Sequence, residues 1–203
     1  MNVRDAEFCV IDLETTGLDL RKDKIIAFAC VPMKGMKILV NNSYYTLIKP
    51  EKYEIKAMKY HGISQHDLND APTFEEISEE ILTRLKGIVV GHAVEIDVAF
   101  LKKYFKKAGI KFERQTIDIA LLEKWLGERL GERKTNEDLT LDALIKNYGL
   151  KATYRHNALA DAFFTAQIFQ IQLLKLLKYG INSVDRILGI LSSCKLSRCD
   201  FIF

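Results

Sequence analysis

The stretch Val10-Ile-Asp-Leu-Glu-Thr-Thr-Gly17 closes an apolar run with two acidic residues, Asp12 and Glu14, two positions apart. Side chains two apart in a strand project from the same face. Two carboxylates at the end of a core strand are unfavourable to bury unless a cation compensates them. Hard divalent metal ions are the usual partners of such oxygen ligands. The stretch therefore predicts a strand that ends in a cation site.

Two later segments add residues of the same chemistry. Asp97 closes Gly91-His-Ala-Val-Glu-Ile-Asp97, and the segment His156-Asn-Ala-Leu-Ala-Asp161 opens the longest predicted helix. A histidine beside a group of carboxylates suits a base that acts on a metal-bound water. The four acids and this histidine therefore predict a hydrolase of phosphodiesters.

Each acid taken singly has a plainer interpretation. Asp12 and Glu14 equally describe two solvated acids at a strand end. Asp97 falls in the first turn of a predicted helix, where the helix dipole favours an acid. Asp161 is the hardest to explain in this way, because its helical neighbours, such as Ala162 and Phe163, are apolar.

Size and composition describe an ordinary α/β globular chain. Its 203 residues predict one domain over residues 1–180 and a helical tail over residues 181–203, either docked or binding a partner. The formal charge of +3 permits nucleic acid as a partner without arguing for it. Met1–Glu7 has no apolar signal region, and no apolar run reaches the ~18 residues of a membrane helix. We therefore expect a cytoplasmic protein with no membrane partner.

The order of predicted elements favours a mixed sheet with helices on its faces. Four strands in the first fifty residues predict an antiparallel meander: Glu7–Asp12, Lys24–Val31, Lys37–Asn41 and Ser43–Lys49. Helices alternating with short strands follow at Phe74–Leu85, Ile88–Val90, Glu95–Ala108, Ile117–Leu126, Thr140–Tyr148 and Ala158–Tyr179. The charged stretch from Gly127 to Asp138 is expected to be an exposed loop.

The three acidic segments resemble the Exo I, Exo II and Exo III motifs of the DEDD exonucleases, the DnaQ-like group. His156 stands five residues before Asp161, as in the DEDDh branch; the sister branch has tyrosine where this chain has Asn157. The segments His61–Ile63 and Leu141–Leu144 also resemble the family, so that the likeness covers about residues 7–175. It implies a ribonuclease H-like fold, with a five-stranded mixed sheet flanked by helices.

The resemblance implies 3′→5′ removal of nucleotides as 5′-monophosphates by two divalent ions, Mg²⁺ or Mn²⁺. Its implied catalytic residues are Asp12, Glu14, Asp97, His156 and Asp161, the four acids as metal ligands. His156 would take the proton from the attacking water. The implied contacts to the terminal nucleotide are Thr15, Thr16, Leu18 and His61.

The favoured substrate is the 3′ end of single-stranded DNA, in a proofreading or repair role like that of the DNA polymerase III epsilon subunit. RNA is the alternative, because this chemistry ignores the sugar unless a contact reads the 2′-hydroxyl. A module of another class, catalytically inactive and bound to nucleic acid or to a polymerase, is the third hypothesis. A DNA polymerase partner and a homodimer are further expectations.

Two positions depart from the family pattern. Four other residues near the motifs are expected to contact the substrate backbone or to cap helices. The family has asparagine after the second-motif histidine and an aromatic residue before the aspartate, where this chain has Ala93 and Ile96. Contacts to the nucleotide near that motif are therefore expected to differ. Lys151 and Arg155 precede His156 and are expected to contact the substrate backbone. Caps at helix starts are expected at Asp118 and Asp142.

Overall fold

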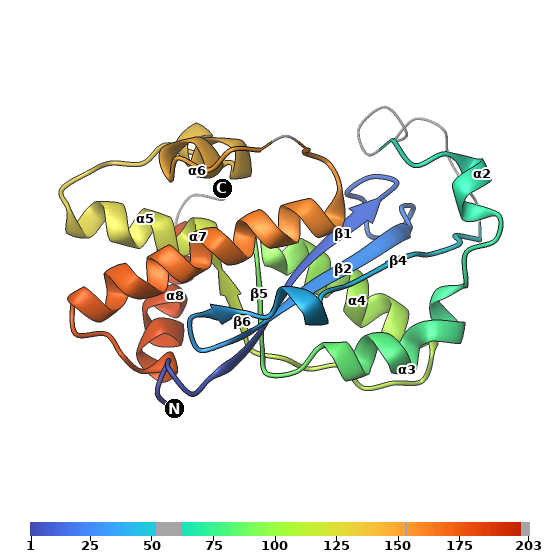
Figure 1. The fold of residues 1–203 in the computed structure, drawn as a ribbon, viewed down its shortest axis with the longest axis horizontal. Coiled ribbons are helices and arrows are strands. Elements are labelled where there is room, and N and C mark those ends of the chain that lie inside the picture. The colour runs from blue at the N-terminus through green and yellow to red at the C-terminus, as the bar shows by residue number, and fades with distance from the viewer. Residues whose placement is uncertain (52–61, 153, 200–203) are drawn as a thin grey trace.

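A mixed β-sheet forms the centre of the fold (Figure 1). The computed structural model describes residues 1–51, 62–152 and 154–199, the last five by their backbone alone. The strands are β1 (Glu7–Thr15), β2 (Ile25–Lys34), β3 (Lys37–Ile38), β4 (Tyr44–Leu47), β5 (Ile88–Gly91) and β6 (Thr116–Asp118).

The strand order is β3-β2-β1-β5-β6, and β4 also pairs with β2. Because β1 occupies one edge of β2 along its whole length, β3 and β4 share the other edge. Six strands thus fill five positions. The meander β1-β2-β4 is antiparallel, whereas β1, β5 and β6 are parallel. The predicted α/β fold with a mixed sheet of about five strands is confirmed.

Helices cover both faces of this sheet. They are α2 (Gln65–Leu68), α3 (Phe74–Arg84), α4 (Val94–Lys107), α5 (Ile119–Arg129), α6 (Leu141–Asn147), α7 (Ala158–Lys178) and α8 (Val184–Cys199). In Figure 1, α7 crosses one face of the sheet, where Phe169 packs against Phe8 of β1 with ring centroids 5.1 Å apart. Helices α3 and α4 form a second core on the opposite face, around Phe28.

Strand alternation decides which face carries the acids. Val10 is buried in the α7 core, whereas Ile11 is buried in the core with α3 and α4. Asp12 and Glu14 follow Val10 by two and four residues, so both lie on the α7 face. The fold therefore places these acids opposite the helix that carries Asp161.

Most predicted elements agree with the structure, and two predictions were wrong in detail. The strand expected over Lys37–Asn41 is only the two-residue β3, because the chain then turns through a 3₁₀ helix, η1 (Val40–Asn42). The loop expected from Gly127 to Asp138 is shorter, because α5 continues to Arg129 and a second 3₁₀ helix, η3 (Glu137–Leu139), interrupts it.

The chain start and the C-terminal helix are joined. The Met1 amino group lies 2.8 Å from the Asp185 carboxylate, and the Val3 N–H donates to Asn182 O at 2.8 Å. In α8, Val184 and Ile187 are buried in the core beside α7. The first half of α8 is therefore packed against the core that also contains α7.

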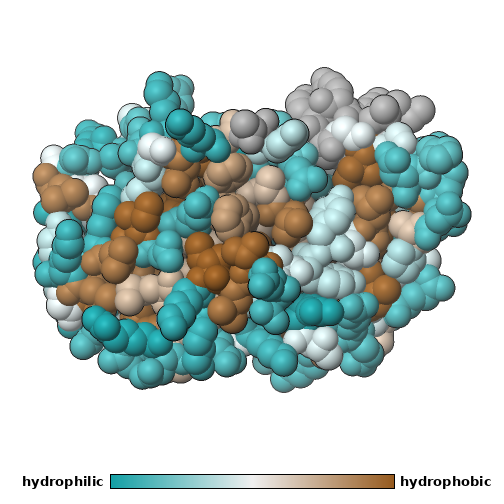
Figure 2. Space-filling view, in the orientation of Figure 1, coloured by the Kyte–Doolittle hydropathy of each residue, from teal (hydrophilic) through white to brown (hydrophobic). Residues whose placement is uncertain are grey.

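The face of the molecule seen in Figure 2 carries both hydrophobic and hydrophilic residues. Figure 2 shows hydrophobic residues gathered near its centre, with hydrophilic ones around them. Exposed hydrophobic side chains occur at Val40 in η1 and Leu174 in α7. Among the described helices, none combines the length and the apolar character needed to cross a membrane.

Helix α3 begins with a capping box that can be tested. Thr73 Oγ1 accepts from Glu76 N at 3.4 Å, and the Glu76 carboxylate accepts from Thr73 N at 2.8 Å. Thr73→Ala should lower the free energy of unfolding by about 1 kcal/mol. The control is Thr83→Ala, an exposed change within the same helix that should cost less than ~0.5 kcal/mol. Equal losses in urea denaturation of the two variants would contradict the assignment of the cap.

Candidate active site

The carboxyl ends of the three parallel strands meet at one edge of the sheet. Asp12 and Glu14 lie near the end of β1, Asp97 lies in the first turn of α4 after β5, and Asp118 closes β6. Asp118 accepts from Ala120 N at 2.8 Å and caps α5, as the sequence predicted. In open α/β sheets this edge is where ligands bind.

Three carboxylates form the closest acidic group in the described part of the chain. Asp12, Glu14 and Asp161 each offer an oxygen, and these oxygens lie within 4.8 Å of one another. Asp161 is 6% exposed and comes from the first turn of α7. The two predicted motifs at opposite ends of the sequence are therefore brought together.

Asp97 lies outside that group but interacts with it electrostatically. The pKa of Asp12 is raised mainly by burial, and the charges of Asp97, Asp161 and Glu14 raise it further. The pKa of Asp97 itself is raised to about 8, mainly by burial and also by Asp118 and Glu14. Four acids thus repel one another at this edge.

The chemistry of this group fits a divalent metal ion. Burial and the charge of Asp161 raise the pKa of Glu14 to about 7, so the ionised form lacks sufficient compensation. The donors of the closest group are all carboxylate oxygens, the ligands preferred by hard cations such as Mg²⁺ and Mn²⁺. Asp12, Glu14 and Asp161 could hold such an ion together.

Arg155 supplies a positive charge in direct contact with the carboxylate group, a contact that the sequence did not predict. One guanidinium nitrogen donates to Asp161, and Nε donates to Asp142 at 2.6 Å. The expectation that Asp142 caps a helix was wrong: Thr140 caps α6, and Asp142 in the first turn forms an ion pair instead. Arg155 faces the acids of its own chain, whereas a contact to the substrate backbone stays a prediction.

His156 borders the carboxylate group without joining it. Its backbone has a φ of 58° and its N–H donates to Asp161 at 3.2 Å. The side chain is exposed and lines a pocket of about 650 Å³ with residues such as Val31 and Phe163. Catalytic hydrogen bonds are often long or poorly aligned in ligand-free sites, so this exposed position is compatible with a role in proton transfer.

The Thr-Thr-Gly turn after β1 is held by internal hydrogen bonds. Thr15 Oγ1 donates to Gly17 O at 2.8 Å, and Thr16 Oγ1 donates to Asp23 at 3.0 Å. A Cβ at Gly17 would lie 2.5 Å from the Asp23 carboxylate, so a larger residue there would have to displace the Asp23 side chain. Leu18 is 73% exposed beside it. His61, the fourth expected substrate contact, lies outside the described residues.

The departures in the second motif have a structural setting. Ala93 has a φ of 51°, a left-handed conformation that asparagine tolerates better than alanine. Ile96 is exposed and lines a pocket of about 530 Å³ with His92 and Asp118. This pocket lies over the ends of β5 and β6, on the other side of the acids from His156.

Tyr45 is a neighbour of the site that the sequence did not reveal. It pairs with Ala29 of β2, which in turn pairs with Asp12, so the three side chains share one face. Burial and the charge of Glu14 raise its pKa. The sequence does not specify which residue of β4 pairs with Ala29, because the chain reaches β4 through the turn at η1.

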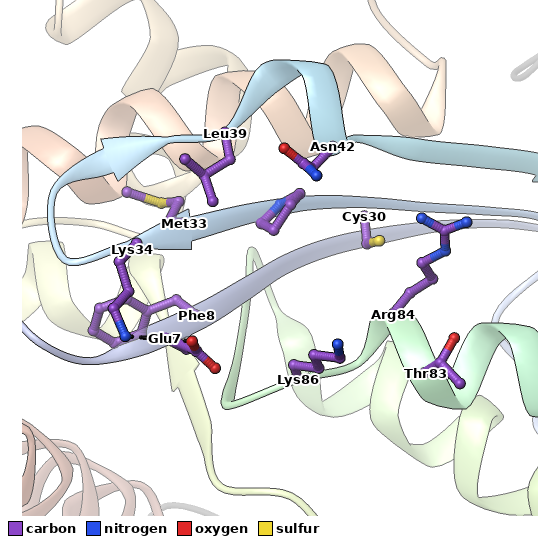
Figure 3. Close-up of a pocket in the computed structure, with 11 residues that line it drawn as sticks. Glu7, Phe8, Cys30, Met33, Lys34, Leu39, Asn42, Thr83, Arg84 and Lys86 are labelled. Carbon is purple, nitrogen blue, oxygen red and sulfur yellow. Dashed lines mark hydrogen bonds and ion pairs between the residues drawn. The ribbon is translucent and has the colours of Figure 1, made fainter.

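A further pocket, of about 500 Å³, lies at the opposite end of β1 (Figure 3). It is lined by Glu7 and Phe8 and by three basic residues, of which Lys34 pairs with Glu7 at 3.3 Å. Figure 3 shows Arg84 and Lys86 at its α3 side. None of the predicted site residues lines it, so it is distinct from the acidic edge.

The fold and the acidic edge define a class, an α/β domain with a group of carboxylates that could hold a metal ion. A family model described as exonuclease matches residues 9–169. The chain belongs to this exonuclease family. The fold agrees with a solved nuclease domain of 3′hExo, a DEDDh family member bound to rAMP, with a TM-score of 0.68 at 17% identity. The match covers 90% of this chain and 98% of that one.

Two curated relatives extend the comparison. The DNA polymerase III subunit epsilon of Aquifex aeolicus is 35% identical over 186 residues, covering 89% of this chain and 88% of the relative. A PolC-type DNA polymerase III of Caldanaerobacter subterraneus subsp. tengcongensis is 34% identical over 189 residues. That match covers 92% of this chain but 13% of the relative, so the chain spans about an eighth of the PolC-type length.

The raised pKa values predict how stability depends on pH without metal. Between about pH 4.5 and 8, the folded protein keeps protons on Glu14 and Asp97 that the unfolded chain has lost. The free energy of unfolding should therefore fall as pH rises through this range. Mg²⁺ favours the ionised acids, so its stabilising effect should be larger at pH 8 than at pH 5.

Thermal unfolding in EDTA and in Mg²⁺ would measure both effects. Glu14→Gln removes one of the titrating groups and should flatten the pH dependence in EDTA. Glu113→Gln, an exposed residue paired with Lys111, is the matched control and should leave that dependence unchanged. A melting temperature in EDTA that rises steadily from pH 5 to pH 8 would show that the buried acids do not govern it.

Proposed function

We propose that this chain is a metal-dependent 3′→5′ exonuclease that removes nucleotides from DNA ends. The observation that carries the proposal is the convergence of Asp12, Glu14 and Asp161 within 4.8 Å, with Asp97 beside them, in a chain of the exonuclease family. DNA is favoured because the named relatives at 34–35% identity are DNA polymerase III proteins. Single-stranded 3′ ends are the proposed substrate.

The four acids have distinct proposed roles at the metal site. Asp12, Glu14 and Asp161 would hold one ion, and Asp97 with Asp12 would hold the second. Divalent ions, Mg²⁺ or Mn²⁺, would supply charge stabilisation and an activated nucleophile at the scissile phosphate. The chain's own part is to fix the oxygens on a rigid strand and a core helix, which reduces reorganisation during the reaction.

The remaining roles concern the proton and the terminal nucleotide. His156 would accept the proton of the attacking water. The exposed Leu18 and the turn hydroxyls of Thr15 and Thr16 would contact the terminal nucleotide, as would His61. Each of these roles can be tested by substitution of the residue concerned.

The name of the epsilon-subunit relative suggests a DNA polymerase as a partner of this chain. A polymerase contact is the natural inference from an epsilon subunit covered over 88% of its length. A homodimer, a partner-binding role for residues 181–203 and a cytoplasmic location stay predictions. The inactive-module hypothesis is disfavoured because all four acids are present and three of them are grouped.

The first test is the product ladder from 5′-labelled single-stranded DNA and RNA of one sequence. Wild-type protein with Mn²⁺ should shorten DNA stepwise, and EDTA should abolish this. Asp12→Asn keeps the side-chain shape but removes the charge shared by the metal ligands. Loss of groups that merely support metal ligands costs ~10–100-fold, so this change should cost roughly a hundredfold or more.

Each outcome of this ladder has a defined meaning. Faster shortening of RNA would keep the mechanism and move the substrate to RNA. Shortening by Asp12→Asn at the wild-type rate would exclude the proposed metal site. No shortening of either polymer, together with protection of the 3′ end, would favour the inactive module.

The role of His156 can be separated from metal binding. His156→Ala should lower the rate constant by ~10²–10⁴-fold, because a positioned base contributes about that much. The stabilisation of the protein by Mn²⁺ should remain, since the acids are untouched. His66→Ala, at an exposed position in α2, is the control and should leave the rate unchanged. Equal rates in the two variants would remove His156 from the base role.

A further inference from the structure

An ion-pair chain links the surface of α6 to the interior of the carboxylate group. Asp142, Arg155 and Asp161 follow one another in this chain, with Arg155 in the middle. The Asp142 side chain is 69% exposed, whereas those of Arg155 and Asp161 are 19% and 9% exposed. A single guanidinium thus bridges a solvated carboxylate and a buried one.

Both oxygens of Asp161 are engaged by the same short segment. The Arg155 guanidinium donates to Oδ1, and the His156 N–H donates to Oδ2 at 3.2 Å. Asp161 is also one of the three acids whose oxygens lie within 4.8 Å. A metal ion bound there must therefore share or take an oxygen that a guanidinium already contacts.

The guanidinium acts on the other acids as well. Its positive charge lowers the pKa of Asp12 and Glu14, against the opposing effects of burial and like charge. Arginine stays charged under all ordinary conditions. Arg155 therefore compensates part of the negative charge in the absence of metal and repels any cation that approaches the group.

We propose that Arg155 is an internal counter-ion that competes with a divalent ion for Asp161, and that Asp142 holds the guanidinium when the ion displaces it. The planar fork of arginine can keep one carboxylate while it leaves another. Asp142 stands on α6, whose Leu144 is buried in the core, so it offers a fixed point for this movement. Arg155 is thus a positioning residue of the metal site.

This inference rests on the proposed metal-dependent function and is tested by metal binding itself. Calorimetric titration with Mn²⁺ at pH 8 should give a dissociation constant about tenfold lower for Arg155→Gln than for wild type. In EDTA the same variant should melt at a lower temperature, because the buried acids lose their counter-ion. Arg4→Gln removes an exposed charge before β1, at the far end from Asp12, and should change neither value.

A double-mutant cycle isolates the part played by Asp142. Asp142→Asn should weaken Mn²⁺ binding several-fold in the wild-type background, because Arg155 is then left to Asp161 alone. In the Arg155→Gln background the same change should have little effect, since no guanidinium remains to be held. Equal effects in both backgrounds would mean that Asp142 acts through its charge alone, and would overturn its role as a holding group.

The outcomes separate this inference from the proposed function. If wild-type protein does not bind Mn²⁺, the proposed function itself fails. If wild type binds Mn²⁺ and Arg155→Gln binds it equally or more weakly, only the counter-ion role is overturned. Should Arg155→Gln not fold in EDTA, Arg155→Lys keeps the charge but lacks the fork. Loss of the coupling to Asp142 in that variant would support the inference, and its persistence would overturn it.

Discussion

The burial of like charges at one edge of the sheet is the constraint on which the site depends. Asp12 and Glu14 cannot move apart, because β1 is paired with β2 on one side and β5 on the other. Asp161 is equally fixed, since α7 is held by buried residues such as Phe169. The fold therefore maintains a negative site that only a cation or bound protons can neutralise.

Much of this arrangement could be predicted from local patterns. The period of two places Asp12 and Glu14 on one face, and the apolar neighbours of Asp161 indicate its burial. The helix expected from Phe74 to Leu85 is found as α3, Phe74–Arg84. The expectation that these distant motifs meet came from the family resemblance. Local sequence patterns do not indicate that β1 and α7 lie side by side.

The features that the sequence did not predict are those whose positions depend on how the fold places its connecting segments. A basic residue before a histidine that is predicted to be catalytic suggests a substrate contact, yet Arg155 pairs with Asp142 and Asp161 of its own chain. The sequence does not show that Ala93 must adopt a left-handed conformation where β5 turns into α4. Tyr45 likewise reaches the site only through the register of β4.

The two sides of the acidic site are held in place in different ways. One side is β1, fixed by pairing on both edges, whereas the other is the segment between α6 and α7. Arg155 and His156 are consecutive in that segment and both contact Asp161. An ion that takes the oxygens of Asp161 would therefore disturb the Arg155 guanidinium and the His156 N–H together.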